Sequence, residues 1–303
     1  MDIYLPIAGQ SVNALLMIAL GGLVGVLSGM FGVGGGFLTT PLLIFYGIPP
    51  TVAVASATTQ ITGASVSGVY AHYRRGGVDL KMGGVMTAGG AVGSLVGAVL
   101  FRLLQASGQI DLVIAFLYVL LLGSIGSLML RDALVTLGWV ERPAATGKRP
   151  HHNRWIAGLP LRWRFYASGL YVSPLAPLIL GFGVGILTVL LGVGGGFILV
   201  PAMIYLLGMA ARVVIGTSLV MVLAVSAVTT MVHAMTTGAV DIVLAGLLLV
   251  GGVVGAQYGA VLATRIKPDM LRLALAVVIL LVAARMAAGL AWRPDEIFSV
   301  EYL

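Results

Sequence analysis

The sequence predicts an all-α polytopic membrane protein made of two inverted repeats, each with about five helical segments. Three observations predict this class: an apolar composition, an internal duplication, and the placement of basic residues between apolar segments. Of 303 residues, 59% are hydrophobic and 9% are charged, and the mean hydropathy is +1.09. Soluble domains carry about a quarter charged residues, so most of this surface must face lipid.

Composition also excludes several functions. The formal net charge of +7 does not indicate nucleic acid binding, because the basic residues lie in short gaps between apolar segments. The chain has no cysteine, which excludes disulfides and thiolate metal sites. An enzyme within the membrane needs clustered titratable or metal-binding side chains at membrane depth, and the apolar segments offer none. We therefore expect no catalytic activity, no metal and no cofactor.

A duplicated glycine block relates the two halves. The sequence Gly-Val-Gly-Gly-Gly-Phe at 32–37 recurs at 192–197, and a proline follows each copy, at Pro41 and Pro201. Further identities continue on both sides with small slips. The sequence therefore predicts two repeats, offset by about 160 residues.

Each repeat divides into five apolar segments, of which most are long enough to span a bilayer. The second segment of each repeat is short, and we expect it to be a short or re-entrant helix. The segments lie near 13–31, 34–47, 51–73, 79–104 and 110–130, and near 169–190, 193–208, 211–236, 240–263 and 270–290. The expected units are a first transmembrane repeat (1–130), a basic cytoplasmic linker (131–168) and a second transmembrane repeat (169–303).

The basic residues predict the topology, because they accumulate on the cytoplasmic side. The loop after the third segment contains Arg74, Arg75 and Lys81 in the first repeat, whereas its equivalent at 236–241 contains no base. The loops after the fourth segments show the opposite asymmetry. Equivalent loops thus lie on opposite sides, which predicts inverted repeats in an inner or plasma membrane with both termini outside. The charges do not decide whether the first two segments of each repeat both span the membrane or form a re-entrant hairpin.

The glycine blocks are candidate anion sites. Each block precedes a short helix, and the first N–H groups of a helix lack internal acceptors while the helix dipole adds partial positive charge. Bare glycine backbone exposes these groups and needs no Lys or Arg to bind an anion. The alternative is that the glycines only permit a tight break and close packing. The candidate residues are Gly34, Gly35, Gly36, Gly194, Gly195 and Gly196.

Polar side chains at the start of the third segments are candidate substrate ligands. In the first repeat they are Ser56, Thr58, Thr59 and Gln60, and in the second Thr217 and Ser218. Hydroxyls on a helix can instead bond to carbonyls of their own helix. Gln60 is the stronger candidate, because a buried primary amide needs several partners.

His72 and His233 occupy equivalent positions near the ends of the third segments. Histidine titrates near neutral pH, so the pair are candidates for proton coupling. The alternative is that both are interfacial residues without a role in coupling. Asp79 and Asp241 precede the fourth segments, and we expect them to cap those helices.

Glycines at every fourth position mark one face of each fourth segment. On a helix this stripe forms a smooth face that a neighbouring backbone can approach closely in lipid. We therefore expect a packing role for the stripes, which are Gly89, Gly93 and Gly97 in the first repeat and Gly251, Gly255 and Gly259 in the second.

The two glycine blocks with their prolines, joined by a basic linker, resemble the TauE/SafE family of sulfite exporters over nearly the whole chain. The resemblance implies a permease for sulfite, sulfonates or related sulfur oxyanions, driven by the proton gradient. The stretch from Ser56 to Gln60 is similar to the small-hydroxyl segment of that family, as is Gly216–Ser218. Met221 stands opposite Gln60, so the two halves of the site differ.

The expected function is secondary transport of small anions by alternating access. The expected partners are the anionic substrate and the lipid bilayer, and a homo-oligomer is left open. A passive anion channel and a membrane protein without transport activity are the alternatives. The sequence contains no Gly-x-x-x-x-Gly-Lys-Ser/Thr loop for ATP-driven transport.

Overall fold

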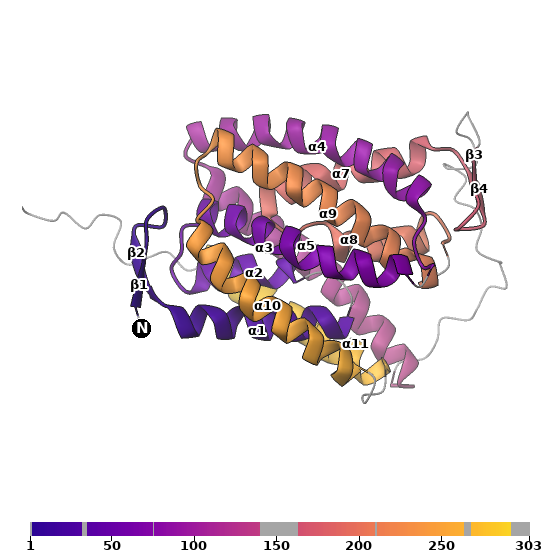
Figure 1. Cartoon of the computed structure of the whole chain (residues 1–303). Coiled ribbons are helices and arrows are strands. Elements are labelled where there is room, and N and C mark those ends of the chain that lie inside the picture. The colour runs from indigo at the N-terminus through magenta and orange to yellow at the C-terminus, as the bar shows by residue number, and fades with distance from the viewer. Residues whose placement is uncertain are drawn as a thin grey trace, which may run out of the picture.

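The structure, a computed structural model, describes residues 2–31, 35–74, 76–139, 163–209, 211–263 and 268–291 (Figure 1). Within these described residues, each half has a short β-hairpin followed by five helices. The first half contains β1 (Asp2–Leu5), β2 (Gln10–Asn13), α1 (Ala14–Phe31), α2 (Gly36–Phe45), α3 (Pro50–Arg74), α4 (Leu80–Ala106) and α5 (Ile110–Thr136). The second contains β3 (Trp163–Phe165), β4 (Leu170–Val172), α7 (Leu175–Leu191), α8 (Gly196–Tyr205), α9 (Ala211–Thr236), α10 (Ile242–Ala263) and α11 (Pro268–Ala291).

The two antiparallel hairpins were not expected from the sequence. Strands of three or four residues are too short to show an alternating pattern. The range expected as linker, 131–168, contains secondary structure at both ends. Helix α5 continues into it as far as Thr136, and the second hairpin begins within it at Trp163. The hairpins lie at opposite ends of the helical bundle (Figure 1).

The helices confirm an all-α polytopic membrane protein. Five described helices, α4, α5, α9, α10 and α11, are long and apolar enough to cross a bilayer. The second helix of each half is short, as expected: α2 and α8 have 10 residues each, or about 15 Å of helix, half the hydrocarbon thickness.

The halves exchange their first helices. Helix α1 packs along α10, and α7 packs along α4. A Cβ atom on Gly93 of α4 would lie 2.1 Å from the carbonyl oxygen of Phe182, and one on Gly255 of α10 would lie 2.1 Å from that of Gly22. Because only hydrogen fits at these crossings, the structure confirms the expected packing role of the glycine stripes.

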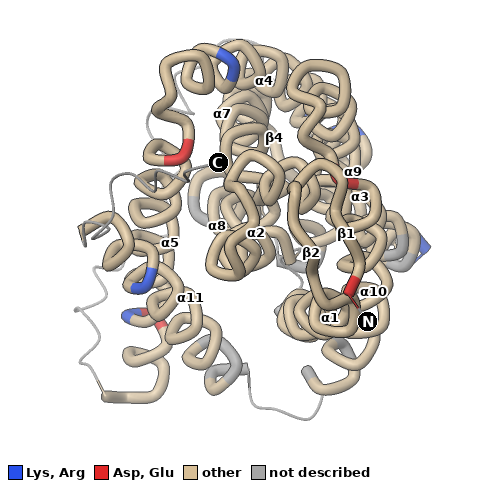
Figure 2. The backbone as a smooth tube through the Cα atoms, turned by 90° about the vertical axis from the view of Figure 1, so that its left-hand side faces the viewer, with Lys and Arg blue, Asp and Glu red and all other residues tan. Residues whose placement is uncertain are grey.

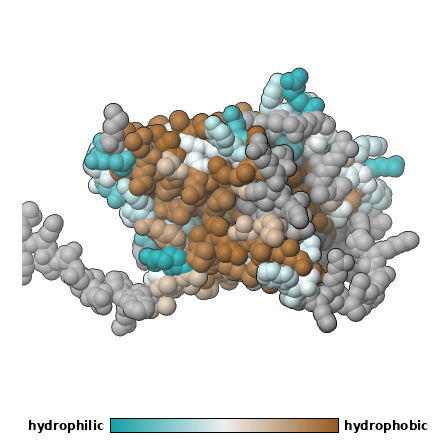
Figure 3. Space-filling model, turned by 90° about the horizontal axis from the view of Figure 1, so that it is seen from below, coloured by the Kyte–Doolittle hydropathy of each residue, from teal (hydrophilic) through white to brown (hydrophobic). Residues whose placement is uncertain are grey.

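Charges lie away from the centre of the bundle. Seen along its length, α2 and α8 occupy the centre, and the coloured charged positions lie around them (Figure 2). Hydrophobic residues cover the middle of the face seen in Figure 3, with more hydrophilic residues toward its two ends. This distribution is that of a body surrounded by lipid.

Candidate functional site

The starts of α2 and α8 meet at the centre of the bundle. The rings of Phe37 and Phe197, the second residue of each helix, stack with centroids 4.7 Å apart and an interplanar angle of 8°. A Cβ atom on Gly36 would lie 2.9 Å from the carbonyl oxygen of Gly192. The duplicated glycine blocks are thus in direct contact.

Glycine is needed in the two turns for different physical reasons. Gly194 and Gly195 have φ angles of +70° and +77°, a region that other residues rarely adopt. Gly35 has an ordinary helical φ of −66°, but a Cβ atom there would lie 2.6 Å from Val24 Cγ1. Conformation therefore requires glycine in the second turn, and space requires it in the first. Gly34 lies outside the described residues.

Ile61 lies between the two turns. A Cβ atom on Gly36 would be 2.0 Å from Ile61 Cδ1, and one on Gly194 would be 2.8 Å from Ile61 Cγ2. This single buried side chain therefore covers the backbone of both helix starts. No pattern in the sequence indicates Ile61, because it is one apolar residue among many.

A small cavity of about 20 Å³ opens beside the first turn of α2. Its volume is enough for about one water molecule. Leu38 and Thr39 both donate to the carbonyl of Gly35, so the preceding amides of the helix have no acceptor within it. The walls come from α1, α2, α3 and α10 and contain Val24, Gly25, Ser28, Gly35, Gly36, Gln60, Ile61, Ala64, Gly252 and Ala256.

Gln60 is the principal polar side chain on the cavity wall. Its side chain is buried, with 4% exposed. Its Nε2 donates to the carbonyl of Leu248 at 3.3 Å, while its Oε1 has no partner among the described residues. In the other half Met221 takes the equivalent place and contacts Gly90, so the two halves of the site differ as the sequence indicates.

The candidate hydroxyls on α3 and α9 are already bonded. Thr58, Thr59 and Ser218 donate to carbonyls of their own helices, and Thr59 also lies 3.4 Å from the hydroxyl of Thr230. Ser56 accepts the amide of Asp241 at 3.2 Å, and Thr217 accepts that of Asp79 at 2.9 Å. Ser56 and Thr217 therefore stabilise the starts of α10 and α4, each of which belongs to the opposite half.

Asp79 and Asp241 cap α4 and α10, as expected. Each Oδ1 accepts an amide of its own helix at 3.0 Å, from Met82 and Leu244 respectively. Each Oδ2 accepts from a hairpin turn of the other half: Asp79 from Ser168, and Asp241 from the amide of Ile7 at 3.2 Å. Each buried carboxylate thus links the start of its own helix to the hairpin turn of the other half.

His233 is buried within the protein. Its side chain is 1% exposed and its Nε2 lies 3.1 Å from the carbonyl oxygen of Val189, which requires a proton on Nε2. Its ring packs edge-on against Phe101. Helices α4 and α7 therefore cover this ring near the end of α9. His72 is half-buried and also has a partner.

Sequence reasoning missed Tyr118. This buried phenol on α5 donates to the carbonyl of Leu191, the last residue of α7, immediately before the second glycine turn. A tyrosine in the middle of an apolar segment needs a hydrogen-bond partner and could have been singled out. Tyr118 and His233 together anchor the carbonyls that lead into this turn.

The model of the family described as "Sulfite exporter TauE/SafE" matches residues 17–286. The chain belongs to the TauE/SafE family. A probable membrane transporter protein of Xylella fastidiosa is 29% identical over 84% of this chain and 87% of its own length. The probable membrane transporter protein YjnA of Bacillus subtilis is 31% identical over 89% of this chain and 97% of its own length.

A plant relative is similar over a shorter range. "Sulfite exporter TauE/SafE family protein 3" of Arabidopsis thaliana is 34% identical over 47% of this chain and 29% of its own length. No solved structure shows a significant match to the chain. The family and the helices establish a multi-pass membrane transporter and not an enzyme.

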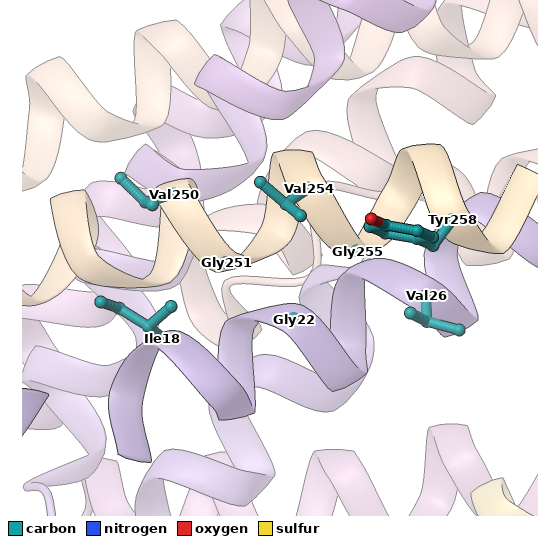
Figure 4. Close-up of a pocket in the computed structure, with 8 residues that line it drawn as sticks. All are labelled: Ile18, Gly22, Val26, Val250, Gly251, Val254, Gly255 and Tyr258. Atoms are coloured by element: carbon teal, nitrogen blue, oxygen red, sulfur yellow. The ribbon is translucent and has the colours of Figure 1, made fainter. Parts of the chain in front are cut away.

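This TauE/SafE member also has a larger hollow, of about 300 Å³, on the outer side of the α1–α10 pair (Figure 4). Ile18, Val26, Val250, Val254 and Tyr258 line it together with three glycines. It offers no positive or amide group from a side chain, so it does not suit an anion. The central cavity at Gln60 is the better candidate site.

Proposed function

We propose that the protein is a secondary transporter of small sulfur oxyanions, such as sulfite and organosulfonates. The contact between the two glycine helix starts carries the proposal. These starts provide partial positive charge, and no ionised side chain of the described residues lines the cavity beside them. The buried carboxylates of the described residues, Asp79 and Asp241, are both engaged in helix caps and hairpins. The plant relative is named a sulfite exporter family protein, which supports the same substrate class.

The proposed mechanism is alternating access between two inverted repeats in the inner membrane, coupled to protons. The exchange of α1 and α7 between the halves and the hairpins at opposite ends of the bundle support the inverted arrangement. Site residues proposed from the sequence are the glycines at 34–36 and 194–196 and Gln60. His72 and His233 are the proposed proton-coupling residues. A cavity of only about 20 Å³ favours a carrier over an open channel.

Uptake of labelled sulfite into proteoliposomes tests this function. A carrier gives saturable uptake that increases with an imposed proton gradient and shows no single-channel conductance. Gly36→Ala should abolish uptake, because its Cβ atom would meet Ile61 and the carbonyl of Gly192. Gly123→Ala is the matched control, since nothing lies within 4 Å of a Cβ there. Uptake equal to that of empty liposomes would refute sulfite transport, and a conductance without saturation would indicate the channel.

A further inference from the structure

The orientation of the Gln60 amide is determined by its neighbour. An amide nitrogen only donates and a carbonyl oxygen only accepts, so Nε2 must be the atom that faces the carbonyl of Leu248. Exchanging the two ends of the amide would place two acceptors 3.3 Å apart. The end without a partner among the described residues is therefore Oε1, a hydrogen-bond acceptor, on the wall of the central cavity.

This acceptor is not required by the fold. A buried carbonyl oxygen without a donor is unfavourable. The opposite half uses Met221 at the equivalent position, fully buried against Gly90, and packs without any polar group there. An unsatisfied acceptor at only one of two equivalent positions points to a ligand that supplies the missing donor.

We propose that the central site selects singly charged oxyanions that also carry a hydrogen-bond donor, an O–H or an N–H. The inference rests on the proposed function and narrows its substrate class. The negative oxygens would lie toward the first turn of α2, whose leading amides donate, and the O–H or N–H would point to Gln60 Oε1. Hydrogensulfite and sulfamate have this pattern. A fully deprotonated sulfate has only acceptors and meets the lone pairs of Oε1.

Two probes of nearly equal shape isolate the donor. Sulfamate and methanesulfonate both carry one negative charge at neutral pH, and they differ in an amino group against a methyl group. Each is used to inhibit uptake of labelled sulfite into proteoliposomes that contain the full chain. We expect sulfamate to inhibit about five- to tenfold more strongly, the range of one hydrogen bond to a neutral acceptor.

Variants at positions 60 and 221 test whether Gln60 causes the preference for sulfamate over methanesulfonate. Gln60→Met copies the other half and should make the two probes equally effective. Met221→Leu is the matched control, a volume-conserving change that should keep the preference. If Gln60→Met does not give a monodisperse protein, Gln60→Leu replaces it.

The outcomes separate this inference from the proposed function. Equal inhibition by the two probes in the unmodified protein overturns the inference while leaving anion transport intact, and so does a preference that survives in the Gln60 variants. Absence of sulfite uptake, with no binding of either probe to the purified protein, removes the proposed function itself.

Discussion

At the residue scale, the centre of the molecule depends on a few side chains that cover bare backbone. Ile61 contacts the positions of both Gly36 and Gly194, while Gln60 beside it presents the free acceptor. The same stretch of α3 thus combines an apolar cover with a polar ligand. Gln60 and Ile61 are adjacent in sequence, so their side chains point about 100° apart around α3.

Ile61→Ala should open the space over both helix starts. We expect the free energy of unfolding to fall by about 2 kcal/mol or more, since a buried isoleucine leaves a cavity. Larger sulfonates should then compete with sulfite better than they do in the unmodified protein. Thermal unfolding in detergent and inhibition of labelled sulfite uptake measure the two effects. Ile61→Val should change both only slightly, and an unchanged size preference in Ile61→Ala would argue against Ile61 as the cover.

Thr217→Val removes the hydroxyl that accepts the amide of Asp79 and keeps the shape of the side chain. The unpaired buried amide should cost about 1–3 kcal/mol of stability. Anion affinity of the folded protein should remain unchanged, because the hydroxyl is bonded to the backbone. Thermal unfolding and titration calorimetry test this, with Thr217→Ser as the control that restores the acceptor. Weaker anion binding at unchanged stability would instead assign Thr217 to the substrate.

At the element scale, glycine faces determine how the helices pair. Along α7, a Cβ atom on Gly185 would lie 2.1 Å from the carbonyl oxygen of Gly90, whereas a Cβ atom on Gly183 would meet nothing within 4 Å. The contact at Gly185 is with backbone, so it cannot be relieved by rotating a side chain. The two positions are two residues apart and lie on opposite sides of α7, so only Gly185 meets the neighbouring backbone.

Gly185→Ala should separate α7 from α4 and lower the melting temperature. Gly183→Ala should leave it unchanged or raise it slightly, since alanine is favoured over glycine in a helix by about 1 kcal/mol. Thermal unfolding of the two purified variants provides the comparison. Gly25→Ala, whose Cβ atom would lie 2.3 Å from the carbonyl oxygen of Gly252, should behave like Gly185→Ala. Equal stability of Gly183→Ala and Gly185→Ala would show that the crossing is looser than the structure has it.

Helices were easier to predict from the sequence than their partners. The bounds of α9, Ala211–Thr236, agree with the expected segment because apolar residues and flanking glycines mark its ends. The stripe on α10 predicted close packing, but regular spacing does not reveal which helix approaches it. The hairpins and the contact of Ile61 with both glycine turns were missed for a similar reason, since they depend on contacts between distant residues. Gln60 was identified because an amide is rare in an apolar segment.

At the scale of the whole molecule, each half supplies hydrogen bonds to helix starts of the other half. The hairpin of one half bonds to the capping aspartate of the other, and Ser56 and Thr217 repeat this exchange near the same helix starts. The pairs of contacts are related by the duplication, so the same interaction occurs at both ends of the bundle. This arrangement leads to a direct test of the inverted topology.

Single cysteines in the two hairpin turns should be labelled from opposite sides of the membrane. The chain has no native cysteine, so Ile7→Cys and Tyr166→Cys have no background. Both side chains are accessible, with 44% and 81% exposed. A membrane-impermeant maleimide should label Ile7→Cys in intact cells, and Tyr166→Cys only after the membrane is opened. Labelling of both positions in intact cells would contradict the inverted repeats.

The exchange of first helices has a consequence for biogenesis. The glycine face of α1 is made early in synthesis, and its partner α10 is made near the end. Until then α1 must reside in the bilayer with an incomplete neighbour, and pairing over so long a sequence separation is slow. The nascent first half is therefore the stage at which this protein is most exposed to misassembly and to quality-control proteases.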